Sequence, residues 1–158
     1  GSIMGDGMIE REHIEGVMVT PLKIIDVPGG DVLHAMKSSD PGYEGFGEAY
    51  FSTVELGAIK AWKRHQKMTL NLVVPVGSVR FILFDDRSNA SSYGWFQQVE
   101  LSKEHYCRLT IPPMIWMGFQ GIYDGVSTLL NIANTQHQVD EVDRKEMKEI
   151  DFDWGLNL

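Results

Sequence analysis

Residues 59–67 read Ile-Lys-Ala-Trp-Lys-Arg-His-Gln-Lys, a strand-like run that carries four cations and one imidazole. Successive side chains of a strand point to opposite faces, so Lys63 and His65 share one face while Lys60 and Trp62 share the other. Such a strand is either an exposed edge whose lysines block aggregation or one wall of a site for an anionic ligand, because lysine binds phosphate as a point charge. The residues alone leave both interpretations open.

Short segments rich in Val, Ile, Phe and Thr continue on both sides of this run, and helical apolar spacing is almost absent. Turn clusters such as Pro28-Gly29-Gly30 and Asn89-Ala90-Ser91-Ser92 separate the segments. This pattern predicts an all-β fold, a closed sandwich or barrel, with a helix only at 141–148. The expected strands are 16–25, 31–37, 47–54, 58–64, 68–76, 79–86, 95–101, 107–111, 115–120 and 127–133.

The 158 residues, 43% hydrophobic and 23% charged, predict a single globular domain over residues 9–158, after a tag remnant or disordered start at 1–8. A net charge of -8 is the wrong sign for nucleic acid, which we therefore exclude as a partner. The single cysteine, Cys107, excludes an intramolecular disulfide or a cysteine-based zinc site and indicates the cytoplasm. No apolar run approaches the roughly 20 residues of a membrane helix, so we expect no membrane partner.

An ordered set of motifs extends over nearly the whole chain: Gly47-Glu48-Ala49-Tyr50-Phe51-Ser52, Lys60-Ala61-Trp62-Lys63-Arg64-His65, Met68-Thr69-Leu70-Asn71, Phe84-Asp85-Asp86-Arg87 and, towards the two ends, Gly16-Val17-Met18-Val19-Thr20-Pro21 and Ile150-Asp151-Phe152-Asp153-Trp154. In these segments the chain resembles the dTDP-4-dehydrorhamnose 3,5-epimerase family of cupins. This resemblance implies a jelly-roll cupin that usually forms homodimers and acts on nucleotide-linked 4-keto sugars.

Many cupins hold a metal through a His-x-His pair, a glutamate and a last histidine. By resemblance, these positions fall at Lys63 and His65, at Leu70 and at Met117. A lysine ammonium does not coordinate a metal, and neither leucine nor methionine is a hard-metal ligand. We therefore expect no metal and no cofactor.

In the epimerases a histidine base removes a proton next to a ketone, a tyrosine acid returns one from the other side, and a lysine steadies the enolate. The resemblance places the family's histidine at Lys63 and its tyrosine at Asn131, and it places the carboxylate that orients the histidine beyond Leu158. The related nucleotide-sugar 3,4-ketoisomerases use a His-x-His pair on the same strand, and the second histidine aligns with His65. The resemblance thus implies proton chemistry next to a carbonyl, on carbons that it does not specify.

His65 is the best candidate for the base, because imidazole titrates near neutral pH and the adjacent Lys63 disfavours its protonated form. Lys63 would also stabilise the enolate oxygen. Glu48 and Tyr50 align with the polar pair that contacts the nucleotide in the epimerases, so we expect them to bind substrate. The predicted site contains His65 and Lys63 as catalytic residues and Glu48, Tyr50, Lys60, Asn71 and Asn131 as substrate-binding residues.

The expected function is that of a cytoplasmic, homodimeric epimerase that acts on a nucleotide-diphosphate-linked 4-keto-6-deoxy sugar in surface polysaccharide or deoxysugar biosynthesis. The segment 16–39 is long, strand-forming and apolar, and we expect it to pair with the sheet of a second subunit. Two alternatives stand beside this interpretation: a 3,4-ketoisomerase, and a non-catalytic cupin that binds sugar nucleotides.

Overall fold

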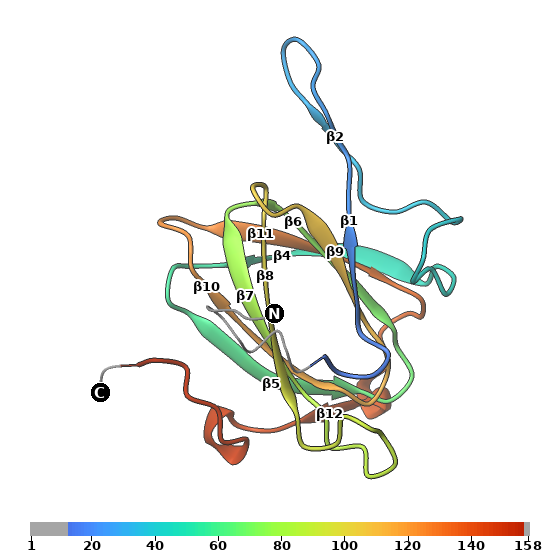
Figure 1. Cartoon of the computed structure of the whole chain (residues 1–158), viewed down its shortest axis with the longest axis vertical. Coiled ribbons are helices and arrows are strands. Elements are labelled where there is room, and N and C mark those ends of the chain that lie inside the picture. Colours follow the sequence, from blue (N-terminus) through green and yellow to red (C-terminus); the bar gives the residue numbers. More distant parts are fainter. Residues whose placement is uncertain (1–12, 157–158) are drawn as a thin grey trace.

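Two antiparallel five-stranded sheets pack face to face in the computed structural model, which describes residues 13–156 (Figure 1). In spatial order, the first sheet contains β1 (Met18–Pro21), β9 (Cys107–Ile111), β6 (Leu70–Val76), β11 (Ser127–Ala133) and β4 (Glu48–Val54). The second contains β12 (Val142–Arg144), β5 (Ile59–His65), β10 (Trp116–Gly121), β7 (Ser78–Phe84) and β8 (Phe96–Ser102). The prediction of an all-β jelly roll is confirmed. Within residues 13–156 no helix is long and apolar enough to cross a membrane.

The predicted helix at 141–148 is wrong. The residues form the edge strand β12 between two short 3-10 turns, Val139–Glu141 and Met147–Glu149. The physical reason is that the neighbouring strand β5 has an otherwise unpaired edge, and β12 satisfies the backbone groups there by pairing Val142 with His65. Pairing with β5 therefore decides the conformation of residues 142–144, and the helix expected from the sequence does not form.

The predicted strands 16–25 and 31–37 are also longer than those observed. The first is interrupted after Pro21, and β2 (Ile24–Ile25) pairs only with β3 (Val32–Leu33). A turn closed by the hydrogen bond from Gly30 N to Val27 O folds the chain back on itself. The result is a two-stranded ribbon that projects from the body of the molecule (Figure 1).

Apolar side chains pack between the sheets and also cover the outer face of the second sheet. Phe81 and Leu109, both 0% exposed, belong to the inner cluster. On the outer face, Trp154 from the carboxy-terminal segment packs on Trp62, with ring centroids 5.5 Å apart. A Cβ atom at Gly118 would lie 3.2 Å from the Trp154 ring and 2.6 Å from Ala61 Cβ, so glycine is required for this close approach. The carboxy-terminal segment is thereby held against β5 and β10.

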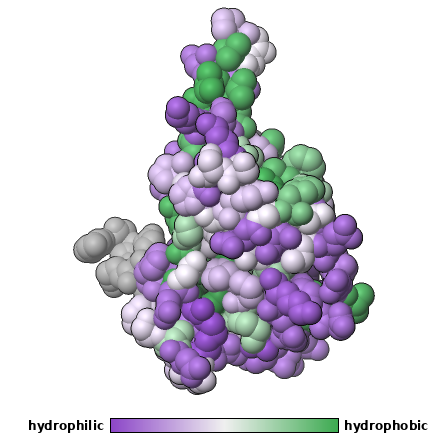
Figure 2. Space-filling view, turned by 90° about the vertical axis from the view of Figure 1, so that its right-hand side faces the viewer, coloured by the Kyte–Doolittle hydropathy of each residue, from purple (hydrophilic) through white to green (hydrophobic). Residues whose placement is uncertain are grey.

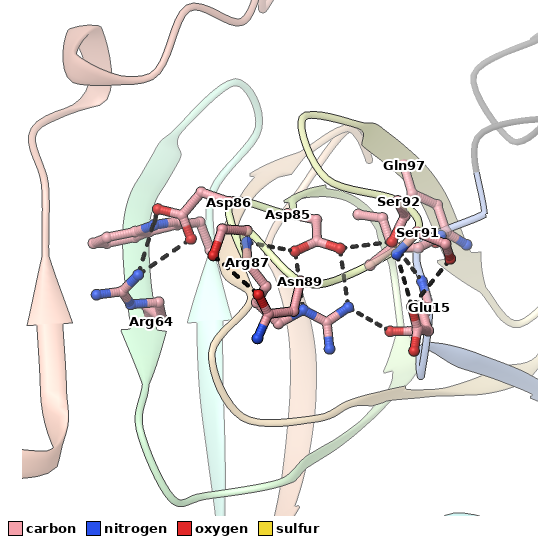
Figure 3. A network of polar contacts seen from close by, with 12 residues as sticks. Glu15, Arg64, Asp85, Asp86, Arg87, Asn89, Ser91, Ser92 and Gln97 are labelled. Carbon is pink, nitrogen blue, oxygen red and sulfur yellow. Dashed lines mark hydrogen bonds and ion pairs between the residues drawn. The ribbon is translucent and has the colours of Figure 1, made fainter.

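A polar network ties the start of the described chain to the loop before β8 (Figure 3). Asp85, 0% exposed, accepts hydrogen bonds from Arg87 and from Ser92 Oγ at 2.6 Å. Glu15 in turn accepts hydrogen bonds from Ser91, and its own backbone N–H donates to Ser92 Oγ. Burial opposes ionisation of Asp85, but the hydrogen bonds from Arg87 and Ser92 outweigh burial and lower its pKa. Asp85 and Arg87 thus form a structural ion pair.

We predict that Asp85→Asn lowers the free energy of unfolding at neutral pH by about 2 to 4 kcal/mol, because it breaks buried charge-assisted hydrogen bonds. Asp151→Asn, an exposed control, should change it by less than about 0.5 kcal/mol. The pKa of Asp85 is lower in the folded protein than in the unfolded chain, where it is about 3.9. Ionised Asp85 therefore stabilises the fold at pH values above about 3.9, and this contribution disappears as the pH falls through the pKa of the folded state. Urea unfolding at several pH values measures the difference; an equal effect of both variants would contradict the prediction.

Candidate functional site

A cavity of about 440 Å³ lies between the two sheets and has polar side chains on both walls. Its apolar lining includes Leu72 and Leu129 from the first sheet and Met117 from the second. Of the seven predicted site residues, five line this cavity: His65, Lys63 and Lys60 on β5, Tyr50 on β4 and Asn131 on β11.

The other two predicted substrate-binding residues lie elsewhere. Glu48, at the start of β4, accepts a hydrogen bond from the backbone N–H of His137 at 3.1 Å. Asn71 alternates along β6 with the cavity residues Leu70 and Leu72, so it faces the other side of the sheet. There its amide donates to Gly42 O at 3.0 Å and accepts from Thr110 Oγ1 at 2.6 Å.

Lys60 lies on the cavity side although strict alternation predicts the opposite face. The register between β5 and β10 shifts: Met117 pairs with Lys63, but Phe119 pairs with Lys60. An irregularity of this kind places an extra residue on one strand and reverses the alternation beyond it. Lys60 therefore shares a wall with Lys63, and its Nζ donates to Thr53 O at 3.0 Å.

A buried hydrogen bond orients His65. Its Nδ1 lies 2.6 Å from Glu141 Oε1, and the exposed fractions of the two side chains are 8% and 3%. Glu141 Oε2 accepts two further hydrogen bonds from the backbone N–H groups of Lys67 and Met68. Burial raises the pKa of Glu141, but these hydrogen bonds outweigh burial and lower it. Glu141 is therefore a carboxylate at neutral pH.

The tautomer of His65 follows from this charge state. A carboxylate only accepts hydrogen bonds, so the hydrogen of a neutral His65 ring must be on Nδ1 and the lone pair on Nε2. Among the described residues Nε2 has no hydrogen-bond partner, and His65 lines the cavity. The geometry thus supplies a proton acceptor with a carboxylate behind it, the arrangement of a general base.

Sequence analysis missed Glu141. The resemblance placed the orienting carboxylate beyond Leu158, and the helix predicted at 141–148 hid the strand pairing that brings residue 141 next to residue 65. No spacing rule connects positions 76 residues apart. The acidic pair Asp140-Glu141 was the sole signal in the sequence, and such pairs are common on protein surfaces.

On the opposite wall, Asn131 holds the phenol of Tyr50. Asn131 is 1% exposed; its Nδ2 donates to the Tyr50 hydroxyl oxygen at 3.0 Å, and its Oδ1 accepts from Asn71 N at 3.1 Å. Because the Tyr50 oxygen accepts this hydrogen bond, its own hydrogen remains available for a ligand in the cavity. Tyr50 belongs to the first sheet and His65 to the second, so the two groups approach the cavity from different walls.

Positive charge gathers on the β5 wall. Burial lowers the pKa of Lys63, and the neighbouring cations Arg144 and Lys60 lower it further. Within residues 13–156, no group of three or more His, Cys, Asp or Glu side chains is arranged to hold a metal ion. The cavity is suited to an anionic ligand that carries a group for proton transfer.

No family model matches the chain, but solved structures do. The dTDP sugar isomerase of Desulfovibrio desulfuricans G20 is 36% identical, covers 85% of this chain and 87% of its own, and gives a TM-score of 0.83. The dTDP-6-deoxy-D-glucose-3,5-epimerase of Legionella pneumophila Philadelphia 1, solved with dTDP-4-keto-L-rhamnose, is 18% identical over 91% of this chain and 81% of its own, with a TM-score of 0.79. At 18% identity, the similarity to the Legionella enzyme shows a common fold and no more.

A curated relative is similar as well. The probable low-salt glycan biosynthesis epimerase Agl13 of Haloferax volcanii is 25% identical over 137 residues, which cover 85% of this chain and 88% of Agl13. Two jelly-roll sheets around a cavity with polar walls define the class of protein, a cupin. Within that class, the chain belongs to the dTDP-4-dehydrorhamnose 3,5-epimerase family of nucleotide-sugar epimerases and isomerases. The predicted family is confirmed, and with it an enzyme of the isomerase class.

We predict that NMR of the histidine side chains shows neutral His65 as the Nδ1–H tautomer, because Glu141 accepts that hydrogen. Long-range nitrogen–proton spectra distinguish the two tautomers directly. Glu141→Ala should remove the preference and leave the spectrum of His105, an exposed control, unchanged. A predominant Nε2–H tautomer in the unmodified protein would contradict the proposed pairing.

Proposed function

We propose that the protein epimerises a nucleotide-diphosphate-linked 4-keto-6-deoxy sugar at a carbon next to the ketone, with His65 as the general base. The observation that carries this proposal is the His65–Glu141 pair at the wall of the cavity, 2.6 Å between Nδ1 and Oε1. Relatives with related substrates support the choice of sugar, since one structure is of a dTDP sugar isomerase and another holds dTDP-4-keto-L-rhamnose.

In the first step, Nε2 of His65 takes the proton from the carbon next to the ketone. The electron pair of the broken C–H bond moves toward the carbonyl and leaves an enolate oxygen. Glu141 stabilises the imidazolium that forms, because its carboxylate is already hydrogen-bonded to Nδ1. Lys63, on the same wall, donates a hydrogen bond to the enolate oxygen, and its positive charge stabilises the negative charge that forms there.

In the second step, a proton must return to the opposite face of the same carbon, since inversion requires two faces. Tyr50 meets this requirement because it comes from the first sheet, across the cavity from His65. Its hydroxyl donates the proton as the enolate closes to the ketone, and the hydrogen bond from Asn131 stabilises the phenolate that results. In this proposal Tyr50 acts as the general acid, beyond the binding role that sequence analysis gave it.

A 3,4-ketoisomerase is the second candidate. The alignment of His65 with the second histidine of the ketoisomerase pair favours it, as does the position of His65 two residues beyond the epimerase base. In that reaction the proton is moved between neighbouring carbons and the carbonyl migrates. The single cysteine and a nucleotide-sugar substrate fit a cytoplasmic enzyme of polysaccharide or deoxysugar biosynthesis.

We predict that the protein, incubated with a nucleotide 4-keto-6-deoxy sugar in deuterated water, places deuterium at C3, C5 or both, because an enolate exchanges its carbon-bound proton with solvent. His65→Gln should slow this exchange by about 10²- to 10⁴-fold and leave nucleotide binding nearly intact. Tyr50→Phe should still permit the first proton removal but slow net inversion. NMR and mass spectrometry measure the label.

The position of the label separates the candidate functions. Inversion with label at C3 or C5 supports the epimerase, whereas a carbonyl at C3 identifies a ketoisomerase. His137→Gln, which changes a histidine outside the cavity, should exchange at the unmodified rate. Absence of deuterium from substrates that the protein demonstrably binds would refute the enzymatic proposal and leave a sugar-nucleotide binding protein.

We also propose that the protein is a homodimer and that the ribbon of β2 and β3 contributes to the interface. The ribbon extends from the body and carries exposed apolar side chains (Figure 2). Ile25 is 44% exposed and Val32 is 49% exposed. A monomer would leave these side chains in water, whereas a second copy of the chain can cover them.

Light scattering at micromolar concentration should therefore return about twice 17.8 kDa. We predict that the double substitution Ile25→Glu and Val32→Glu shifts the mass toward that of the monomer, because two charges would be buried at the interface. Val139→Glu changes a residue that is 83% exposed and lies outside the ribbon, and it should leave the mass unchanged. A mass near 17.8 kDa for the unmodified protein would contradict the dimer.

A further inference from the structure

The side chain of Arg144 lies on the cavity side of β12. Arg144 pairs in register with Lys63, and both residues line the cavity. The charged ends of the side chains on either side of Arg144 reach the outer side of the sheet, although Lys145 also lines the cavity. Asp143 forms an ion pair there with Arg64 at 2.8 Å, and Lys145 Nζ lies 5.0 Å from the centroid of the Trp116 ring.

Arg144 differs from the other arginines that the structure describes. Arg64, Arg80, Arg87 and Arg108 all donate side-chain hydrogen bonds to carboxylates, an amide or backbone carbonyl oxygens. Among residues 13–156, Arg144 is the arginine whose side chain forms no hydrogen bond and no ion pair. Its five N–H donors are free for a ligand.

Arg144 is exposed at the edge of the cavity, and its positive neighbours make this part of the wall attractive to an anion. Its partner across the strand pair is Lys63, and the positive charges of Arg144 and Lys60 both lower the pKa of Lys63. Acidic residues outnumber basic ones by 22 to 14 in the chain, and yet no carboxylate within residues 13–156 forms an ion pair with Arg144. Like charges held together repel, and a bound dianion removes the repulsion.

We propose that Arg144 binds the diphosphate of the nucleotide sugar, an inference that rests on the proposed function. A guanidinium matches the geometry of phosphate oxygens with two parallel N–H donors. Lys60 completes the diphosphate site, and Lys63, next to both cations, remains available to the ketone oxygen. Two residues of the short segment 139–145 then have different functions in the reaction: Glu141 orients the base, and Arg144 holds the substrate.

Calorimetry with dTDP and with thymidine, each at two salt concentrations, tests this assignment. Arg144→Gln should weaken dTDP binding about 10- to 100-fold, reduce its dependence on salt, and leave thymidine binding unchanged. Lys148→Gln removes the same charge from a residue outside the cavity and should bind dTDP within about twofold of the unmodified protein. In the exchange reaction, Arg144→Gln should raise the half-saturating substrate concentration and leave the saturated rate within a few-fold.

The outcomes separate this inference from the function on which it rests. Equal dTDP affinity for Arg144→Gln and the unmodified protein would overturn the role of Arg144, while exchange dependent on His65 would leave the proposed function standing. Equal weakening by Arg144→Gln and Lys148→Gln would also overturn it, because the effect would then come from net charge alone. Loss of the saturated rate with unchanged dTDP affinity would make Arg144 a group that acts on the sugar and would overturn the diphosphate assignment.

Discussion

The hydrogen bond between His65 and Glu141 depends on a single strand pairing, and the candidate site depends on that hydrogen bond. β12 occupies the edge of β5 and brings residue 141 next to residue 65. Without this pairing, the edge of β5 would be open to solvent and His65 would lose its orienting carboxylate. The backbone groups of Lys67 and Met68 hold the other oxygen of Glu141, so the carboxylate is fixed on both sides. The segment that contains Glu141 and β12 thus both covers the edge of β5 and orients His65, the proposed base.

The remainder of the carboxy-terminal segment supports this arrangement through packing. Trp154 and Ile150 cover the outer face of the second sheet and contact Trp62, which lies on the same strand as His65. Trp62 Nε1 also donates to Met147 O at 3.0 Å. The outer apolar cluster therefore holds β5 from behind while its inner face lines the cavity. A base positioned by rigid elements keeps its geometry better than one on a loop.

In the mechanism proposed above, the protein keeps the fold of its family and distributes the chemical groups differently. The resemblance places the family's base at Lys63 and its tyrosine at Asn131, and His65 and Tyr50 lie beside them in the same cavity. In this proposal the amide of Asn131 supports the phenol of Tyr50, which comes from the adjacent strand, through their 3.0 Å contact. A cavity between two sheets tolerates such exchanges, since neighbouring strands place their side chains within a few ångströms of one another.

The sequence by itself determined the all-β architecture, the family and four of the residues that line the cavity, His65, Lys63, Tyr50 and Asn131, because alternation along a strand and the order of motifs are local properties. Only the tertiary structure decided the position of Lys60, which depends on a register shift against β10, and the places of Glu48 and Asn71 away from the cavity. It also decided the positions of Glu141 and Arg144 beside the cavity strand β5, because a strand that pairs with an edge far away in the sequence has no local signature. The alternation of polar and apolar residues assigns the side chains of one strand to a face of the sheet. The contacts between side chains of different strands depend on which strands pair and in which register, and only the folded chain establishes this.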